Sequence, residues 1–97
     1  MNTPTDFALD GDLTIRHAAR RRGQLLDWLA QAGPDDALDV AQVSACDTAG
    51  LQLLLALRSS RAAQGRPLTL RHVSPALAGV LALCGLAETL PASDAPA

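Results

Sequence analysis

Aromatic residues are scarce in this chain, whose 97 residues include one Phe, one Trp and no Tyr. Single-stranded nucleic acids are bound largely by stacking their bases on aromatic side chains, and duplexes are bound by clusters of basic residues. The formal net charge is -2, from 8 basic and 10 acidic side chains. We therefore expect no nucleic acid among the partners of this protein.

The chain also lacks any apolar run of the roughly 20 residues that a membrane-spanning helix needs. Its first residues, Met1–Asp6, have neither the basic flank nor the apolar core of a signal peptide. Cys46 and Cys84 lie far apart within apolar stretches, which is typical of small buried hydrophobic residues and not of a disulfide framework. These absences predict a cytoplasmic protein with reduced cysteines and no direct membrane insertion.

Motifs of catalysis and ligand binding are missing as well. No Gly-rich phosphate loop occurs, and His17 has no second ligand at metal-binding spacing. Asp39, His72 and Ser74 supply the residue types of a hydrolytic triad, but no nucleophile elbow surrounds the serine. Cys46 precedes a predicted helix, which can lower a thiol pKa, although burial is the favoured interpretation. We therefore expect no enzymatic activity, no metal and no cofactor.

The apolar content is 48% and is carried mainly by Leu and Ala. A chain of this length suits one domain with one core. We expect residues 1–90 to form that domain, beginning with a polar leader at Met1–Thr5. Residues 91–97 have the composition of a disordered tail.

Three stretches carry the features of helices. The segment Arg16–Gln31 has apolar residues at helical spacing and stops before Gly33-Pro34, and its Arg20-Arg21-Arg22 run is interpreted as a solvated face in preference to a lipid site. The segment Thr48–Ala63 follows the capping residue type Asp and ends before a glycine. Ser74-Pro75 opens a third helix, which Gly85 closes.

Short apolar runs between these helices predict strands. Phe7–Leu9 and Leu13–Ile15 flank Asp10-Gly11, the residue pair of a tight turn, so we predict an antiparallel hairpin. Leu38–Val40 predicts a buried central strand, and Leu68–Leu70 predicts another.

The stretch Ala41–Cys46 is assigned to a loop. The resulting order, two strands and then helices alternating with strands, implies parallel pairing behind the hairpin. The expected fold is α/β, with a mixed four- to five-stranded sheet, an N-terminal β-hairpin and three helices packed on it.

The most distinctive stretch is the polar step Asp47-Thr48-Ala49-Gly50-Leu51, which lies between two apolar segments. Asp and Thr before a leucine-rich run are the residue types that cap a helix, because their oxygens accept from unpaired backbone N–H groups. The same free N–H groups and the helix dipole favour negative charge. A phosphate on Thr48 is therefore compatible with the fold, and Thr48 is a candidate phospho-acceptor.

This step belongs to a longer resemblance that covers Phe7 to Leu90. The residues that carry it are Gly11-Asp12-Leu13, Leu38-Asp39-Val40, Val43, Asp47-Thr48-Ala49-Gly50-Leu51, Gly65, Leu68, Leu70, Val73-Ser74 and Leu83–Leu86. Together they resemble the STAS domain, which is the module of bacterial anti-sigma factor antagonists and of sulfate-transporter tails. The resemblance implies a protein-binding module that switches partners in signal transduction.

In that family the residue after the Asp is phosphorylated by a partner anti-sigma kinase, and here that residue is Thr48. The resemblance thus implies a kinase-like or anti-sigma partner, with Asp47 as the helix cap. Leu53 and Leu57 lie to one side of the helical wheel, where they form a docking patch beside Thr48 or are covered by the third helix. The candidate partner-binding residues are Asp47, Ala49, Gly50, Leu53 and Leu57.

Two alternatives within the family remain open. Many antagonists carry Ser where this chain has Thr48, and a second Ser where it has Ala49. Asp-Thr-Ala-Gly-Leu also resembles the STAS subunit of Mla-type phospholipid transporters, which implies a constitutive subunit bound to the transporter ATPase. Gln52-Leu53-Leu54-Leu55 resembles STAS proteins that are linked to chemotaxis kinases.

Overall fold

The computed structural model describes residues 7–9, 11–33, 36–86 and 89–90. The predicted polar leader, Asp10 of the predicted turn and the predicted 91–97 tail lie outside these residues. The elements, in chain order, are β1 (Phe7–Ala8), β2 (Gly11–Leu13), α1 (Ala18–Gln31), β3 (Leu38–Asp39), β4 (Val43–Cys46), α2 (Thr48–Ala63), β5 (Leu70–Arg71) and α3 (Pro75–Leu83).

The described strands form two small parallel sheets, one with the order β1-β3-β5 and the other with the order β2-β4. Phe7 lies opposite Leu38, and Leu38 lies opposite Leu70. In the second sheet Leu13 lies opposite Cys46. The fold is therefore α/β as predicted, but the five strands of the described residues are divided between two sheets and do not form a single mixed one.

The predicted N-terminal hairpin is wrong, because β1 and β2 pair with β3 and β4 and not with each other. Gly11 does have a left-handed backbone, with φ 76°. It lies, however, where the pairing of β2 with β4 shifts register. A glycine permits such an irregularity as readily as it permits a turn. The glycine of the Asp-Gly pair therefore lies at a break in the parallel pairing of β2 with β4 and not in a hairpin turn.

The predicted loop at Ala41–Cys46 is also wrong in part, because Val43–Cys46 forms β4. Of its four residues only Val43 is buried, and Ser44 is exposed. Because so few of its residues are buried, the alternation of apolar and polar residues that predicts a strand is weak here. The central position of the Leu38 strand is confirmed, since β3 lies between β1 and β5.

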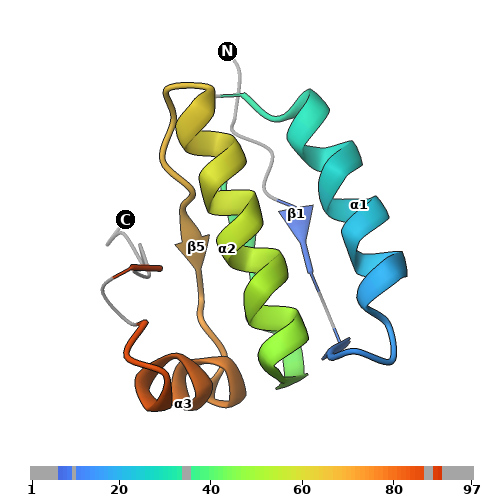
Figure 1. The fold of residues 1–97 in the computed structure, drawn as a ribbon, viewed down its shortest axis with the longest axis vertical. Coiled ribbons are helices and arrows are strands. Elements are labelled where there is room, and N and C mark those ends of the chain that lie inside the picture. The colour runs from blue at the N-terminus through green and yellow to red at the C-terminus, as the bar shows by residue number, and fades with distance from the viewer. Residues whose placement is uncertain (1–6, 10, 34–35, 87–88, 91–97) are drawn as a thin grey trace.

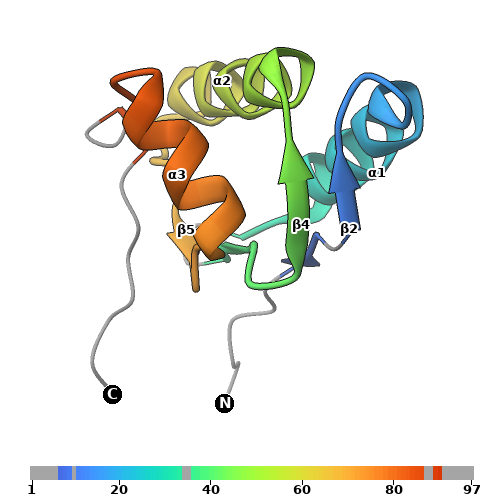
Figure 2. The same cartoon turned by 90° about the horizontal axis from the view of Figure 1, so that it is seen from below.

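The helices were predicted more closely. α2 has the predicted bounds, and α3 begins after Ser74 as expected, while α1 begins two residues later than predicted. In Figure 1, α1 and α2 lie side by side across the strands. Figure 2 shows α3 beside β4, against which it packs. Among the described residues, no helix is both long and apolar enough to cross a bilayer.

One apolar core lies between the helices and the strands. α2 contributes a stripe at helical spacing, formed by Gly50, Leu51, Leu54, Leu57 and Arg61. The other buried apolar residues are Leu9, Leu13, Leu25, Trp28, Ala32, Ala37, Leu38, Val40, Val43, Leu68, Leu70, Leu77, Leu81 and Leu90. The predicted burial of the cysteines holds only in part. Cys46 is half-buried, whereas Cys84, the residue directly after α3, is exposed.

A buried arginine anchors the C-terminal part of α2. The Arg61 side chain is fully buried, and its Nη2 donates to the carbonyl oxygens of Gly33 (3.2 Å) and Asp36 (3.5 Å). Its guanidinium carbon lies 5.3 Å from the centroid of the Trp28 ring, within the range of a cation–π contact. Burial lowers the pKa of Arg61, because it removes water from the charged group. These contacts attach the segment that follows α1 to α2.

Candidate functional site

Asp47 organises the beginning of α2 by accepting two backbone hydrogen bonds. Its Oδ1 accepts from the N–H of Gly50 (3.0 Å), within its own helix. Its Oδ2 accepts from the N–H of Ile15 (3.0 Å), in the connection between β2 and α1. The carboxylate therefore joins two segments that lie 32 residues apart in the sequence.

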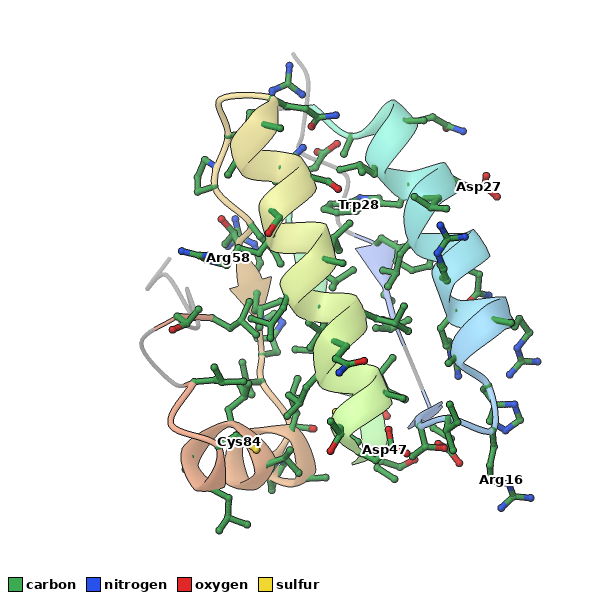
Figure 3. The ribbon with its side chains drawn as sticks, in the orientation of Figure 1. Arg16, Asp27, Trp28, Asp47, Arg58 and Cys84 are labelled. Carbon is green, nitrogen blue, oxygen red and sulfur yellow. The ribbon has the colours of Figure 1, made fainter. Side chains whose placement is uncertain are left out.

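The same hydrogen bonds set the charge at this corner. The bond from Ile15, followed by that from Gly50, holds the pKa of Asp47 below its usual value, because both stabilise the carboxylate form. The side chain is thus an anion at neutral pH, and it lies at the positive end of the helix dipole. Figure 3 shows it at the end of α2, on the side of the connection that carries Arg16.

Thr48 is the first residue of α2, and it is exposed to solvent. Because Asp47 already caps the helix, the threonine hydroxyl is not needed for that role. Ala49, the next residue, is half-buried. The structure therefore places the candidate phospho-acceptor on the surface, where a modifying enzyme can reach it.

Gly50 lies against β2, and no other residue fits there without movement. A Cβ atom on Gly50 would collide with the carbonyl oxygen of Leu13 and would lie 2.9 Å from the Cγ of Leu13. It would also lie 3.0 Å from the Sγ of Cys46. The glycine therefore allows α2 to begin directly beside the ends of β2 and β4, so its part in the candidate site is to position the helix.

The connection before α1, α1 itself and α2 each carry an apolar residue with exposed surface. Ile15, which donates to Asp47, is 70% exposed. Leu53 is half-buried and, with the 45% exposed Leu26, lines a groove of about 140 Å³ between α1 and α2. Leu57 has only 4% of its surface exposed and belongs to the core. Of the two leucines in the predicted patch, only Leu53 has surface to offer a partner.

Cys46 does not have the properties of a nucleophile. Burial, and then the neighbouring negative charge of Asp47, raise the pKa of the Cys46 thiol to about 11. Its Sγ lies 3.5 Å from the carbonyl oxygen of Asp47, to which the thiol can donate. The thiol is therefore protonated at neutral pH, which is opposite to the activated state of catalytic cysteines.

The hypothetical triad is assembled only in part. His72 Nδ1 lies 3.3 Å from Asp39 Oδ2, where Asp39 is the last residue of β3 and His72 is the first residue after β5. Ser74, in contrast, is buried, and its Oγ accepts from the N–H of Leu77 (3.2 Å) as the cap of α3. The serine hydroxyl thus has a structural role.

The arginine run of α1 is also divided. Arg20 and Arg22 are exposed, whereas Arg21 is buried and donates from Nε to the carbonyl oxygen of Asp12 (3.3 Å). The run therefore does not form one solvated face as predicted, because its central residue packs against β2.

Two features of the site were not predicted from the sequence. The contact of Ile15 with Asp47 joins distant segments and leaves no local pattern. The position of Gly50 against Leu13 is likewise a tertiary contact, although a glycine in the first turn of an otherwise apolar helix is a signal that could have indicated a close approach.

Comparisons with known proteins agree with this arrangement. A family model described as "Mlab, STAS domain" matches residues 3–91. A Thermotoga maritima protein, described as a candidate anti-sigma factor antagonist, is 20% identical with a TM-score of 0.72, over 86% of this chain and 74% of that one. A sulfate transporter family protein of Wolinella succinogenes is 27% identical with a TM-score of 0.70, over 88% and 69%.

The anti-sigma factor antagonist SpoIIAA, in its unphosphorylated form, is 21% identical with a TM-score of 0.60, over 86% of this chain and 78% of that one. No curated protein sequence matches the chain. The structural neighbours share the fold, and the family model spans most of the residues, including the corner built by Asp47, Thr48 and Gly50. The chain therefore belongs to the STAS domain family.

Proposed function

We propose that this protein is a partner-binding module that docks through the N-terminal end of α2 and releases its partner when Thr48 is phosphorylated. The observation that carries the proposal is the exposed Thr48 beside a helix cap that Asp47 already supplies. A phosphate there adds up to two negative charges without removing a cap from the fold. A partner docked on this end of α2 would meet those charges directly.

The docking surface that we propose surrounds this hydroxyl. Ile15, in the connection bonded to Asp47, and Leu53, in the second turn of α2, offer apolar contact area, and Asp47 and Ala49 complete the surface. Exposed arginines, Arg16, Arg20 and Arg22, lie on the neighbouring connection and on α1. Such a surface favours a partner with acidic and apolar side chains, of the kinase-like or anti-sigma class.

The test compares the affinity of Thr48→Ala and Thr48→Asp for a partner protein that co-purifies with the chain. Thr48→Ala should bind like the original protein, whereas Thr48→Asp should bind at least about tenfold more weakly because it adds charge at the interface. Ser59→Asp is the matched control, since Ser59 is exposed on α2 but lies about 16 Å further along the helix. Equal affinities of Thr48→Ala and Thr48→Asp would contradict the switch.

A second candidate function is suggested by the description of the matching family model, which names Mlab. In this alternative the chain is a constitutive subunit of a phospholipid transporter and binds its ATPase. It predicts stoichiometric co-purification with an ATPase, no phosphate on the intact chain by mass spectrometry, and binding that survives Thr48→Asp. Phosphate on Thr48 together with release of the partner would support the switch instead.

A further inference from the structure

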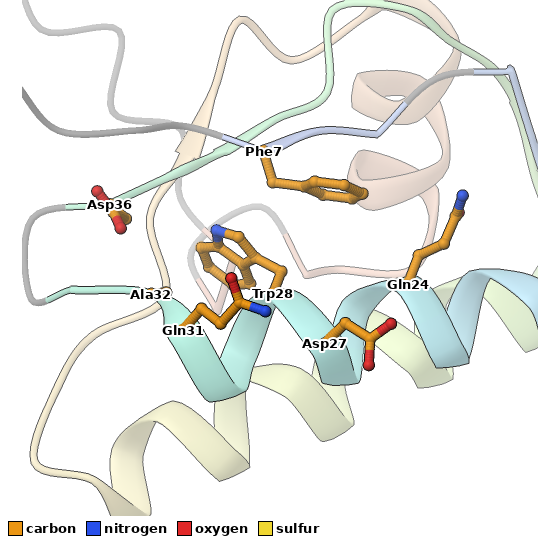
Figure 4. A pocket seen from close by; sticks show the side chains of 7 residues that line it. All are labelled: Phe7, Gln24, Asp27, Trp28, Gln31, Ala32 and Asp36. Atoms are coloured by element: carbon orange, nitrogen blue, oxygen red, sulfur yellow. The ribbon is translucent and has the colours of Figure 1, made fainter.

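A second region of the molecule, distant from Thr48, has the features of a ligand site. A pocket of about 500 Å³ lies along the C-terminal half of α1, lined by Phe7, Gln24, Asp27, Trp28, Gln31, Ala32 and Asp36 (Figure 4). The α1 residues are spaced so that they share one face of the helix. Phe7 of β1 supplies the facing wall, and Asp36 closes one end. The proposed switch uses none of these residues.

Both aromatic residues of the chain lie in this pocket. The sequence contains one Phe and one Trp, and Phe7 and Trp28 line the same space from two different elements. Trp28 is 9% exposed, and Phe7 is half-buried. Aromatic faces attract cations, because the ring quadrupole places negative potential above the ring.

The charged residues of the lining are acidic. Asp27 is exposed on α1, and Asp36 precedes β3 and accepts from the N–H of Gly33 (2.8 Å). Among the described lining residues there is no Lys, Arg or His. A ligand in the pocket therefore meets carboxylates, amides and aromatic rings, which together suit a positively charged organic group.

Two guanidinium groups lie near the pocket but outside its lining. Arg61 contacts the Trp28 ring and donates to main-chain carbonyls, as described above. Arg66 Nη1 donates to the carbonyl oxygen of Ala32 (3.0 Å). Arg61 Nη2 and Arg66 Nη1 donate to main-chain carbonyls, and neither arginine lines the pocket, so the groups that face it remain acidic and aromatic.

We propose that this pocket binds a small organic cation, namely an alkylammonium or guanidinium compound with an apolar portion. The apolar portion packs between Phe7 and Trp28, and the cationic group lies within reach of the Asp27 carboxylate. This binding does not depend on the partner switch. The net charge of the whole chain is only -2 and does not by itself suggest a cationic ligand. The ligand class is indicated by the aromatic and acidic residues that line this pocket together.

Trp28 gives a direct measurement, because it is the only tryptophan and it lines the pocket. Its fluorescence is titrated with choline and, separately, with 3,3-dimethyl-1-butanol, a neutral molecule of nearly the same shape, at constant ionic strength. Choline should bind about fivefold more tightly, the equivalent of a cation–π contribution of about 1 kcal/mol. Equal binding of the two compounds, or no saturable change with choline, would overturn the proposal.

Variants locate the site. Asp27→Asn removes an exposed charge and should weaken choline binding about threefold, while binding of the neutral analogue stays unchanged. Asp39→Asn is the charge-matched control, since Asp39 is the last residue of β3 and does not line the pocket, and it should leave choline binding unchanged. Phe7→Leu should reduce the preference for choline over its neutral analogue. Because Asp27 is exposed, its variant is expected to fold, and unchanged choline affinity in Asp27→Asn would contradict the site.

Discussion

The two ends of α2 use charged side chains in opposite ways. At the N-terminal end the Asp47 carboxylate accepts backbone N–H groups from Gly50 and Ile15 at the surface. Near the C-terminal end Arg61 is fully buried and donates to backbone carbonyls of the segment after α1. Asp47 thus binds backbone groups of α2 and of the connection before α1, whereas Arg61 binds backbone groups of the segment after α1.

The difference lies in what a change at each end would do. A surface corner tolerates new charge because water solvates it, whereas a buried guanidinium has no solvent to replace lost contacts. The exposed end carries Thr48, the hydroxyl for which we propose a regulatory role. We infer that a charged side chain is needed for stability at the Arg61 end of α2, whereas the exposed Asp47 end is the one suited to regulation.

The strongest test of this contrast is Arg61→Ala. It removes a buried side chain, its contact with Trp28 and the donor to two main-chain carbonyls, and should lower the free energy of unfolding by about 4 kcal/mol. Urea denaturation measures the loss. Arg58→Ala, one turn earlier on the exposed side of α2 (Figure 3), should change it by less than about 0.5 kcal/mol. Similar losses in the two variants would contradict a specific stabilising role for the buried Arg61 guanidinium.

Gly50→Ala tests the close approach at the other end. The added methyl group meets the Leu13 carbonyl, so α2 or β2 must shift, and the free energy of unfolding should fall by about 3 kcal/mol. Gly23→Ala in α1 is the matched control, because a Cβ there meets nothing within 4 Å. Alanine favours helix more than glycine does, so this control should gain about 0.5 to 1 kcal/mol. A stabilising Gly50→Ala would contradict the described packing.

Asp47→Asn should have a smaller effect that depends on pH. The pKa of Asp47 is lowered in the folded protein by the bonds from Ile15 and Gly50, so the carboxylate stabilises the fold above its unfolded pKa. That stabilisation is lost as the pH falls through the folded-state pKa, below the ordinary value of 3.8. The urea midpoints of the two proteins should therefore differ at neutral pH and converge in acid. A constant difference across this range would contradict the assigned role.

The smallest effect is expected for Thr48→Ala. Because Asp47 supplies the cap, removing the neighbouring hydroxyl should change the free energy of unfolding by less than about 0.5 kcal/mol. The same urea experiment measures it. A loss above about 1 kcal/mol would show that the hydroxyl is part of the cap, which would leave it less suited to regulation.

Local signals predicted the helices well. α2 begins after an Asp cap and α3 after a Ser cap, and both caps act through contacts three residues away. Such short-range hydrogen bonds are encoded by neighbouring residues, so the sequence alone was sufficient. The position of Thr48 at the start of α2 followed directly from them.

Strand pairing and the burial of Arg61 could not be predicted from such short-range signals. Asp10-Gly11 has the composition of a hairpin turn, but the partners of β1 and β2 come from about 30 residues further along. Nothing in the sequence indicates that Arg61 is buried, because its carbonyl partners lie 25 and 28 residues away. Contacts of this separation depend on how the elements assemble, which periodicity and composition do not record.

The buried arginine also bears on the order in which the chain folds. Its bonds to the segment after α1 close a stretch of chain that contains β3, β4 and most of α2, so we expect them to form late in folding. Contacts that form after the rate-limiting step slow unfolding without speeding folding. We therefore expect loss of the Arg61 guanidinium to shorten the lifetime of the native state while leaving its rate of formation nearly unchanged.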